Sequence, residues 1–183
     1  MSLRDGRLDL LRVDPCSSYD TMCVIRGSAG RDSLFIGDDL GYASLFDVQR
    51  GQLQNVFRRS CKGEGPVRAV CCDAERAELY VSIGSTVERL NRNGKCLLDH
   101  QTHFADDVEQ LELSSGRMLH AASAFVYAAY DAVLQETRSY LADSKIQAMT
   151  LCGSEGEHCY IASADRAMSV IVDGRVLFRR RMD

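Results

Sequence analysis

Residues 33–57 read SLFIGDDLGYASLFDVQRGQLQNVF, with short apolar runs at 34–36, 42–46 and 53–57. Turn-forming residues separate the runs, at 37–41 and again at 49–51. Glycine and aspartate are common in turns, whereas aromatic and aliphatic residues in runs of about five are typical of strands. The stretch therefore predicts a meander of strands rather than a pair of helices.

The same pattern returns in three further stretches, at residues 66–102, 107–141 and 145–182. Two of them contain a strong hairpin signal, Asn93-Gly94 in the first and Asp173-Gly174 in the last. These dipeptides accept the positive φ angles of a tight hairpin turn. The chain thus reads as four units, each with about four short strands.

The expected second strands provide register marks for the repeat. Phe35, Tyr80, Leu119 and Tyr160 are separated by 45, 39 and 41 residues. A period near 40 residues with four strands per unit is typical of the blades of a β-propeller. A β-sandwich is the alternative, but it does not predict a small residue recurring near this mark. Here Gly37, Gly84, Ala121 and Ala162 follow it.

The third unit is the least regular, because residues 116–141 are rich in alanine and could form a helix. Phe125, Tyr127 and Ala129 alternate instead of following one helical face, so we predict strands here as well. The expected blades span approximately residues 20–60, 66–102, 107–141 and 145–182. Residues 6–14, GRLDLLRVD, form a further alternating segment that could close a ring. Four blades are few for a ring, so we expect an arc of a larger propeller.

The composition excludes several classes of protein. The chain has 183 residues, 45% of them hydrophobic, and a formal net charge of −4. The apolar fraction is ordinary, so the chain is expected to fold, as a single domain. Its longest apolar stretches fall well short of the roughly 20 residues that a membrane-spanning helix needs. A pI of 5.6 disfavours general nucleic-acid binding.

The eight cysteines show no C-x-x-C spacing, and the N-terminus shows no secretory signal. We interpret the cysteines as small core residues of a protein in a reducing, cytoplasmic compartment. Cys71 and Cys72 are expected to point to opposite faces of one strand.

Four stretches carry a more specific resemblance. They are GRLDLLRVD at 6–14, SLFIGDDLGYASLFDVQRGQLQNVF at 33–57, ELYVSIGSTVERLNRNGKCLLDHQTHFADDVEQLEL at 78–113, and CYIASADRAMSVIVDGRVLFRRRM at 159–182. Together they resemble the N-terminal propeller of the family of the BBSome subunit Bardet–Biedl syndrome protein 7. Residues 44–52, SLFDVQRGQ, also resemble the end of a WD repeat with Phe46 in place of tryptophan, although the chain has no tryptophan.

The resemblance implies an all-β, WD-repeat-like propeller of seven blades, of which this chain would hold about four. It implies a non-enzymatic scaffold subunit of the BBSome, a coat-like complex that moves membrane proteins into and out of cilia and flagella. The implied partners are the other BBSome subunits and, indirectly, an Arf-like GTPase, membrane cargo and intraflagellar transport trains. The implied locations are the cytoplasm, the basal body and the cilium. No cofactor is implied.

Candidate catalytic or metal-binding residues are few. His100 and His103, near Asp99, Asp106 and Asp107, form the most suggestive cluster for a metal ion. We interpret it as a polar loop between blades, because two histidines in a loop do not fix a tetrahedral site.

Three further motifs are weaker. His158-Cys159 cannot act as a nucleophile pair if the two side chains point to opposite faces of a strand. Asp38-Asp39 reads as a turn rather than a calcium site, and the segment at 63–65 lacks the lysine of a phosphate-binding loop. We therefore predict no catalytic, cofactor or metal site.

Three hypotheses for the function remain. The first is the BBSome scaffold, and the second is a propeller interaction module of another cytoplasmic complex. The third is a metal-dependent hydrolase built on a propeller, with its metal near His100 and His103. The arginine runs at 58–59 and 179–181 could meet an acidic partner, although such runs are more often solvated. The sequence singles out no residues as partner contacts.

Overall fold

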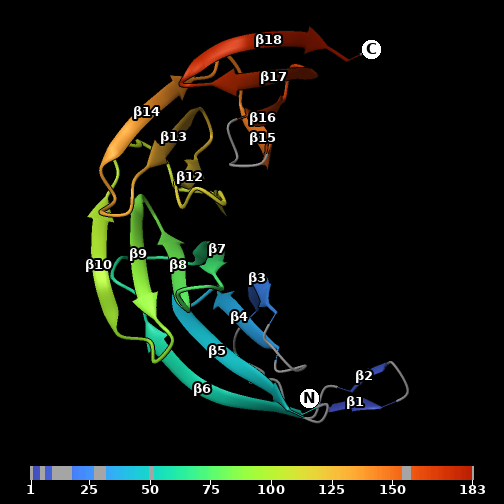
Figure 1. The fold of residues 1–183 in the computed structure, drawn as a ribbon, viewed down its shortest axis with the longest axis vertical. Helices are drawn as coiled ribbons and strands as arrows, with labels where there is room; N and C mark the ends of the chain where they lie inside the picture. Colours follow the sequence, from blue (N-terminus) through green and yellow to red (C-terminus); the bar gives the residue numbers. More distant parts are fainter. Residues whose placement is uncertain are drawn as a thin grey trace.

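The computed structural model describes residues 18–26, 32–49, 52–153 and 158–182, together with the backbone of 2–4 and 7–9. The described elements are all strands, arranged in four antiparallel sheets. Figure 1 shows these sheets, the blades, following one another around an open arc. The predicted all-β propeller with about four blades is confirmed.

Each blade contains four consecutive strands paired in chain order. Blade 1 comprises β3 (Tyr19–Ile25), β4 (Ser33–Asp38), β5 (Tyr42–Gln49) and β6 (Gln52–Ser60). Blade 2 comprises β7 (Val67–Asp73), β8 (Glu78–Ile83), β9 (Thr86–Asn91) and β10 (Cys96–Gln101). Blade 3 comprises β11 (Gln110–Leu113), β12 (Leu119–Ala122), β13 (Val126–Tyr130) and β14 (Glu136–Leu141). Blade 4 comprises β15 (Ile146–Cys152), β16 (His158–Ser163), β17 (Ala167–Val172) and β18 (Arg175–Arg181).

The two predicted hairpin turns have the expected backbone. Asp173 and Gly174 both adopt positive φ, 50° and 73°, between β17 and β18. Between β9 and β10, Gly94 has φ 77°, whereas Asn93 does not adopt positive φ. A turn with positive φ matches the right-handed twist of the strands it joins, and this explains why Asn-Gly and Asp-Gly lie at these positions.

One hydrogen bond recurs in every blade and fixes which residues are equivalent. In each blade, the residue directly after the fourth strand donates its backbone N–H to a carbonyl in the turn between the second and third strands. The donors and acceptors are Cys61 to Gly41 at 3.0 Å, Thr102 to Ser85 at 2.9 Å, Ala142 to Phe125 at 2.8 Å, and Met182 to Arg166 at 2.6 Å. The sequence repeat is therefore also a repeat of backbone geometry.

The alanine-rich third unit forms strands, as predicted, but its register mark is one residue off. Gly84 and Ala124 are equivalent, because the carbonyl of each accepts a backbone N–H from the start of the next blade. The donors are Val108 and Ile146, respectively. Tyr80 lies four residues before Gly84, and His120 lies four residues before Ala124. The second-strand mark in blade 3 is thus His120 and not Leu119.

The core consists of the contacts between consecutive blades. Each blade has a forward face, which contacts the next blade, and a rear face, which contacts the preceding one. In blade 1 the cross-strand set Cys23, Phe35, Leu45 and Phe57 forms the forward face. All four belong to the apolar cluster shared with blade 2, which includes Leu79, Val81 and Leu90. Two further clusters join blade 2 to blade 3 and blade 3 to blade 4.

The outer strands β6, β10, β14 and β18 follow the convex rim of the arc (Figure 1). At the N-terminal end, β1 (Ser2–Arg4) pairs with β2 (Arg7–Asp9) and contacts β6 through Ser2 and Gln52. The remainder of the expected segment at 6–14 lies outside the described residues. The described part of the chain contains no helix that is long and apolar enough to cross a membrane.

Candidate interaction surfaces

A buried ion pair connects blade 1 to blade 2. The Arg59 guanidinium of β6 donates to Glu88 Oε2 of β9 at 2.9 Å, and the Glu88 side chain is fully buried. The Lys62 backbone N–H donates to the other carboxylate oxygen. Arg59 also donates to the Gly94 carbonyl at 3.0 Å. A buried carboxylate needs such partners, so this pair fixes how the two blades meet.

A second buried carboxylate, Asp38, organises the turn after β4. It accepts the backbone N–H groups of Leu40 at 3.1 Å and Tyr42 at 2.8 Å, as well as Arg58 at 3.1 Å. The Arg58 guanidinium lies 4.6 Å from the centre of the Tyr42 ring. Both arginines of the 58–59 run are thus bound within the fold, where sequence reasoning left them open to a partner. Asp39 is also part of the fold, since it accepts from Ser18.

The predicted metal cluster is divided among separate partners. His103 lies 2.7 Å from Glu136, and His100 packs edge-on against the Tyr130 ring with centroids 5.3 Å apart. Asp99 pairs with Lys62 at 2.8 Å, and Asp107 pairs with Arg68 at 3.1 Å. Across the described ranges, no group of three His, Cys, Asp or Glu side chains is arranged to hold a metal ion. The two histidines instead take part in the contact between blade 2 and blade 3.

Residues His158 and Cys159 lie next to each other on β16 with very different surroundings. Cys159 is buried in the cluster between blades 3 and 4, whereas His158 is half-buried. Burial raises the pKa of the Cys159 thiol to about 12, which keeps it protonated and unreactive at neutral pH. The pair therefore offers no activated nucleophile.

The other described cysteines fit the prediction of core residues, with one exception. Cys71 packs in the cluster toward blade 3 and Cys72 in the cluster toward blade 1, so the two point to opposite faces as expected. Seven described cysteines are free, and Cys152 is the exposed one among them. Cys16 lies outside the described residues.

Blade 3 holds a buried polar group that sequence reasoning missed. His120 on β12 is 2% exposed, and its Nδ1 lies 2.8 Å from the Tyr127 hydroxyl. Burial, helped by the positive charge of Arg138, lowers the pKa of His120 to about 4. The imidazole is therefore neutral at pH 7 and serves as a hydrogen-bonding core residue rather than as a catalytic acid.

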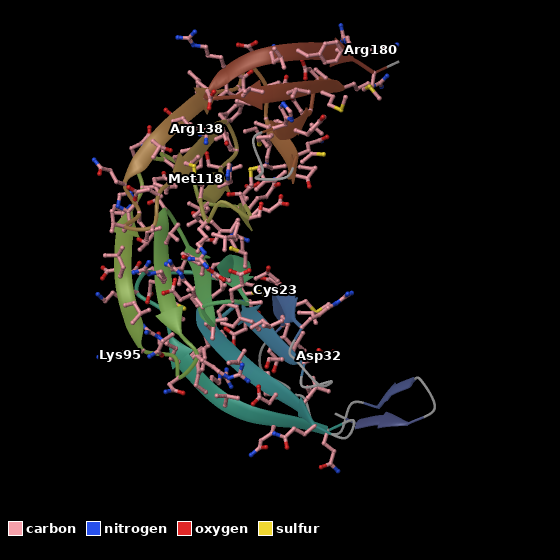
Figure 2. The ribbon with its side chains drawn as sticks, viewed as in Figure 1. Cys23, Asp32, Lys95, Met118, Arg138 and Arg180 are labelled. Carbon is pink, nitrogen blue, oxygen red and sulfur yellow. The ribbon has the colours of Figure 1, made fainter. Side chains whose placement is uncertain are left out.

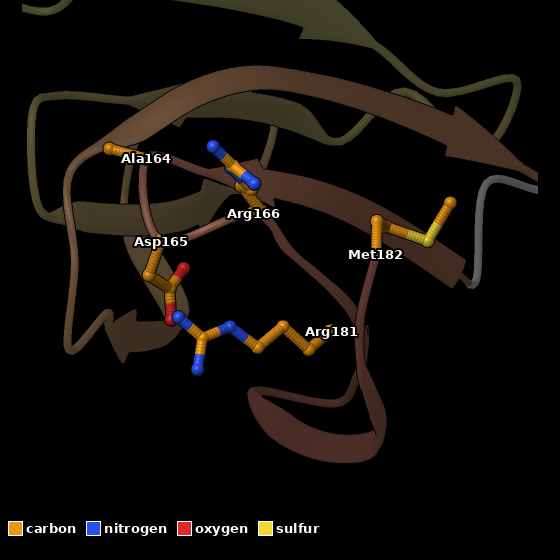
Figure 3. Close-up of a pocket in the computed structure, with 5 residues that line it drawn as sticks. All are labelled: Ala164, Asp165, Arg166, Arg181 and Met182. Carbon is orange, nitrogen blue, oxygen red and sulfur yellow. The ribbon is translucent and has the colours of Figure 1, made fainter.

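A surface pocket of about 560 Å³ lies beside the end of β18, lined by Ala164, Asp165, Arg166, Arg181 and Met182 (Figure 3). Its carboxylate, Asp165, already pairs with Arg179 at 2.7 Å. Arg179 also pairs with Asp143. The lining groups include two guanidinium groups but no nucleophile or general base at a neutral pKa, so the pocket fits a contact surface better than an active site.

The remaining candidate surfaces are the two end faces of the arc. On the rear face of blade 1, Met22 is 70% exposed and Val24 is 59% exposed. They stand opposite Ile36 and Leu34, and Leu34 stands opposite Phe46. On the forward face of blade 4, the cross-strand row consists of Thr150, Tyr160, Val170 and Phe178, and Phe178 is 48% exposed.

These end faces have the same construction as the faces that pack together inside the arc. Each is a four-stranded surface with apolar residues in register, and within the described residues no further sheet covers it. Exposed apolar patches of this kind mark contacts with other protein surfaces. The two end faces are therefore candidate surfaces for contact with other proteins.

The comparisons with known proteins agree with this architecture. A model of the BBS7 β-propeller matches residues 22–183. No curated protein sequence matches the chain.

Among solved structures, the WD40 β-propeller domain of Doa1 is similar, with a TM-score of 0.72 and 14% sequence identity. The similarity covers 90% of this chain and 54% of that one, so the chain spans about half the length of that structure. At this identity the likeness concerns the fold alone. The family match over most of the chain, together with the four blades, establishes that this chain belongs to the BBS7 β-propeller family.

Proposed function

We propose that the chain is a non-enzymatic scaffold module of the BBSome, and that it supports the transport of membrane proteins to and from cilia or flagella. The family match over residues 22–183 is the observation that carries this proposal. The rigid blades and the uncovered apolar end faces support it, since they suit binding to other protein surfaces.

The proposed partners follow from the family. They are the other BBSome subunits by direct contact and, indirectly, an Arf-like GTPase, membrane cargo and intraflagellar transport trains. The proposed locations are the cytoplasm, the basal body and the cilium or flagellum. The chain would act as part of a larger, seven-bladed propeller, in which further blades cover the end faces.

Sedimentation of a native extract tests this proposal. Extract from the ciliated or flagellated cells that make the protein is separated on a density gradient, and the fractions are probed for this chain and for two other BBSome subunits. We expect the three to peak together, far above the 20.3 kDa of the free chain. A separate peak for this chain, with the other two subunits together elsewhere, would contradict the proposal and favour another propeller-containing complex.

A matched variant controls for non-specific association. Lys95 lies exposed in the turn before β10 (Figure 2), away from both end faces. The Lys95→Gln variant should sediment with the other subunits as the natural chain does.

A further inference from the structure

One position on the outer strand takes part in the contact with the next blade in blades 1 to 3. It lies two residues before the donor of the recurring closing hydrogen bond, and it is occupied by Arg59, His100, Tyr140 and Arg180 in blades 1 to 4. The first three each reach the following blade. Arg59 binds Glu88, His100 packs against Tyr130, and Tyr140 joins the apolar cluster between blades 3 and 4.

Arg180 occupies this position in blade 4, where the described structure has no following blade. It stands opposite Met168 on the forward face, beside the row that contains Val170 and Phe178. Figure 2 shows it on β18 at the end of the arc. Its neighbour Arg179 is bound by Asp143 and Asp165, whereas Arg180 has no side-chain hydrogen bond or ion pair among the described residues.

We propose that the forward face of blade 4 binds a further antiparallel blade. Arg180 would favour a blade with a carboxylate on its third strand, at the position equivalent to Glu88 on β9. Such a contact would continue the pattern of the contact between blades 1 and 2. There, an arginine at the same position of the repeat reaches a buried carboxylate on the third strand of the next blade. The apolar row of blade 4 would supply the remainder of the contact. This inference rests on the proposed role of the chain as an arc of a larger propeller.

A second copy of the chain is a poorer occupant of this face. Its rear end face belongs to blade 1, where the buried Ser44 holds the position of Glu88, three residues after the acceptor of the closing hydrogen bond. A hydroxyl does not neutralise a guanidinium that is taken out of water. The carboxylate of Asp38 on the same blade is already occupied by Arg58 and two backbone N–H groups.

The repeat offers a direct test with the chain's own blade. Met182 is equivalent to Cys61, so a second copy of residues 62–102 joined directly after Met182 reproduces the natural connection from blade 1 to blade 2. The copied Glu88 should then face Arg180. We expect hydrogen exchange at β17 and β18 to be at least about threefold slower in the extended chain than in the original chain, because the added blade covers the half-exposed Phe178.

A double-mutant cycle on the extended chain isolates the ion pair. The single variants are Arg180→Gln and Glu88→Gln in the copied blade only. Arg181→Gln is the matched control, since Arg181 stands opposite Ala167 on the rear face of blade 4. We expect each of the two test variants to shift the docking equilibrium, measured by hydrogen exchange at β17 and β18, with a coupling of at least about tenfold between them. The control should not couple to the copied Glu88.

Three results would overturn the inference. One is a coupling of unity between Arg180 and the copied Glu88, and another is unchanged hydrogen exchange at β17 and β18 after the extension. The third is a stable dimer of the original chain in which Phe178 is protected, since a second copy would then be the occupant. The purified chain suffices for all three, so failure to find the BBSome in cells would not affect the result.

Discussion

Arg59 on the outer strand of blade 1 and Glu88 on the third strand of blade 2 meet at 2.9 Å, and the Glu88 carboxylate is fully buried. The two residues are 29 positions apart and belong to different sheets. The side chain of Arg59 keeps 23% of its surface in contact with solvent. Because one partner is fully buried and the other is partly exposed, substitution of Arg59 and substitution of Glu88 should lower the stability by different amounts.

Removal of Arg59 should therefore be the more damaging change. Arg59→Met leaves a buried carboxylate without its counter-ion, and we expect a loss of about 3–5 kcal/mol in the free energy of unfolding. Glu88→Gln leaves a partly solvated arginine, and its one amide oxygen can accept from either Arg59 or the Lys62 N–H, so we expect a smaller loss of about 1–3 kcal/mol. Urea unfolding of the two variants measures both values. Equal losses, or a larger loss for Glu88→Gln, would show that the pair does not act as described.

The buried His120 predicts a dependence of stability on pH. Its pKa is about 4 in the folded chain, against about 6.5 when unfolded, so the unfolded state binds the proton more readily. The contribution of the neutral His120 to the free energy of unfolding is fully present above pH 6.5. It falls by up to about 3 kcal/mol as the pH drops from 6.5 to about 4. Urea midpoints of the natural chain at pH 7 and pH 5 measure this loss.

His120→Gln is the matched variant for that measurement. The amide can still meet the Tyr127 hydroxyl, but it does not titrate in this range. We expect a smaller difference between pH 7 and pH 5 than in the natural chain. If the variant keeps the whole pH dependence, other groups must be its cause.

Gly37 on β4 packs closely against Val67 of blade 2. A Cβ atom at this position would lie 2.2 Å from Val67 Cγ1 and 2.9 Å from Thr21 Cγ2. Gly37→Ala should therefore cost about 1–3 kcal/mol in the free energy of unfolding through overpacking.

Thermal unfolding of a double variant checks the cause. Val67→Ala removes the methyl carbon at 2.2 Å and keeps Val67 Cβ at 2.6 Å, so Gly37→Ala should destabilise the Val67→Ala background less than it destabilises the natural chain. Equal destabilisation in both backgrounds would exclude the Val67 methyl groups as the reason.

The partners of His100 and His103 predict weak metal binding. His103 is held at Glu136, and His100 is packed on Tyr130. After incubation with zinc and passage over a desalting column, we expect far less than one zinc per chain by elemental analysis. One equivalent that disappears in the His103→Gln variant would instead support the hydrolase hypothesis.

The architecture could be predicted because it depends on local patterns. Asn93-Gly94 and Asp173-Gly174 set tight turns through their own backbone preferences, and short apolar runs between turns define strands. Even the alanine-rich segment around Tyr127 could be assigned correctly, since alternation distinguishes a strand from a helix. The register of blade 3 could not be fixed in this way, because both Leu119 and His120 are plausible second-strand residues until the pairing with β11 is known.

The functional surfaces could not be predicted, because they depend on pairs far apart in the chain. In the sequence, Glu88 is an ordinary polar residue between Val87 and Arg89, and nothing local shows that Arg59 covers it. Arg180 likewise reads as one of three arginines. It differs from Arg179 only because the fold places Asp143 and Asp165 beside Arg179.

Affinity purification of the endogenous protein, followed by quantitative mass spectrometry, tests the proposed function most directly. A tag is introduced at the natural locus, and the proteins recovered are compared with those from untagged cells. The proposal predicts that the other BBSome subunits are recovered together and in near-equal amounts. Recovery of this chain alone, or with an unrelated assembly, would contradict the proposed role in the BBSome and leave a propeller of the same family with a different partner.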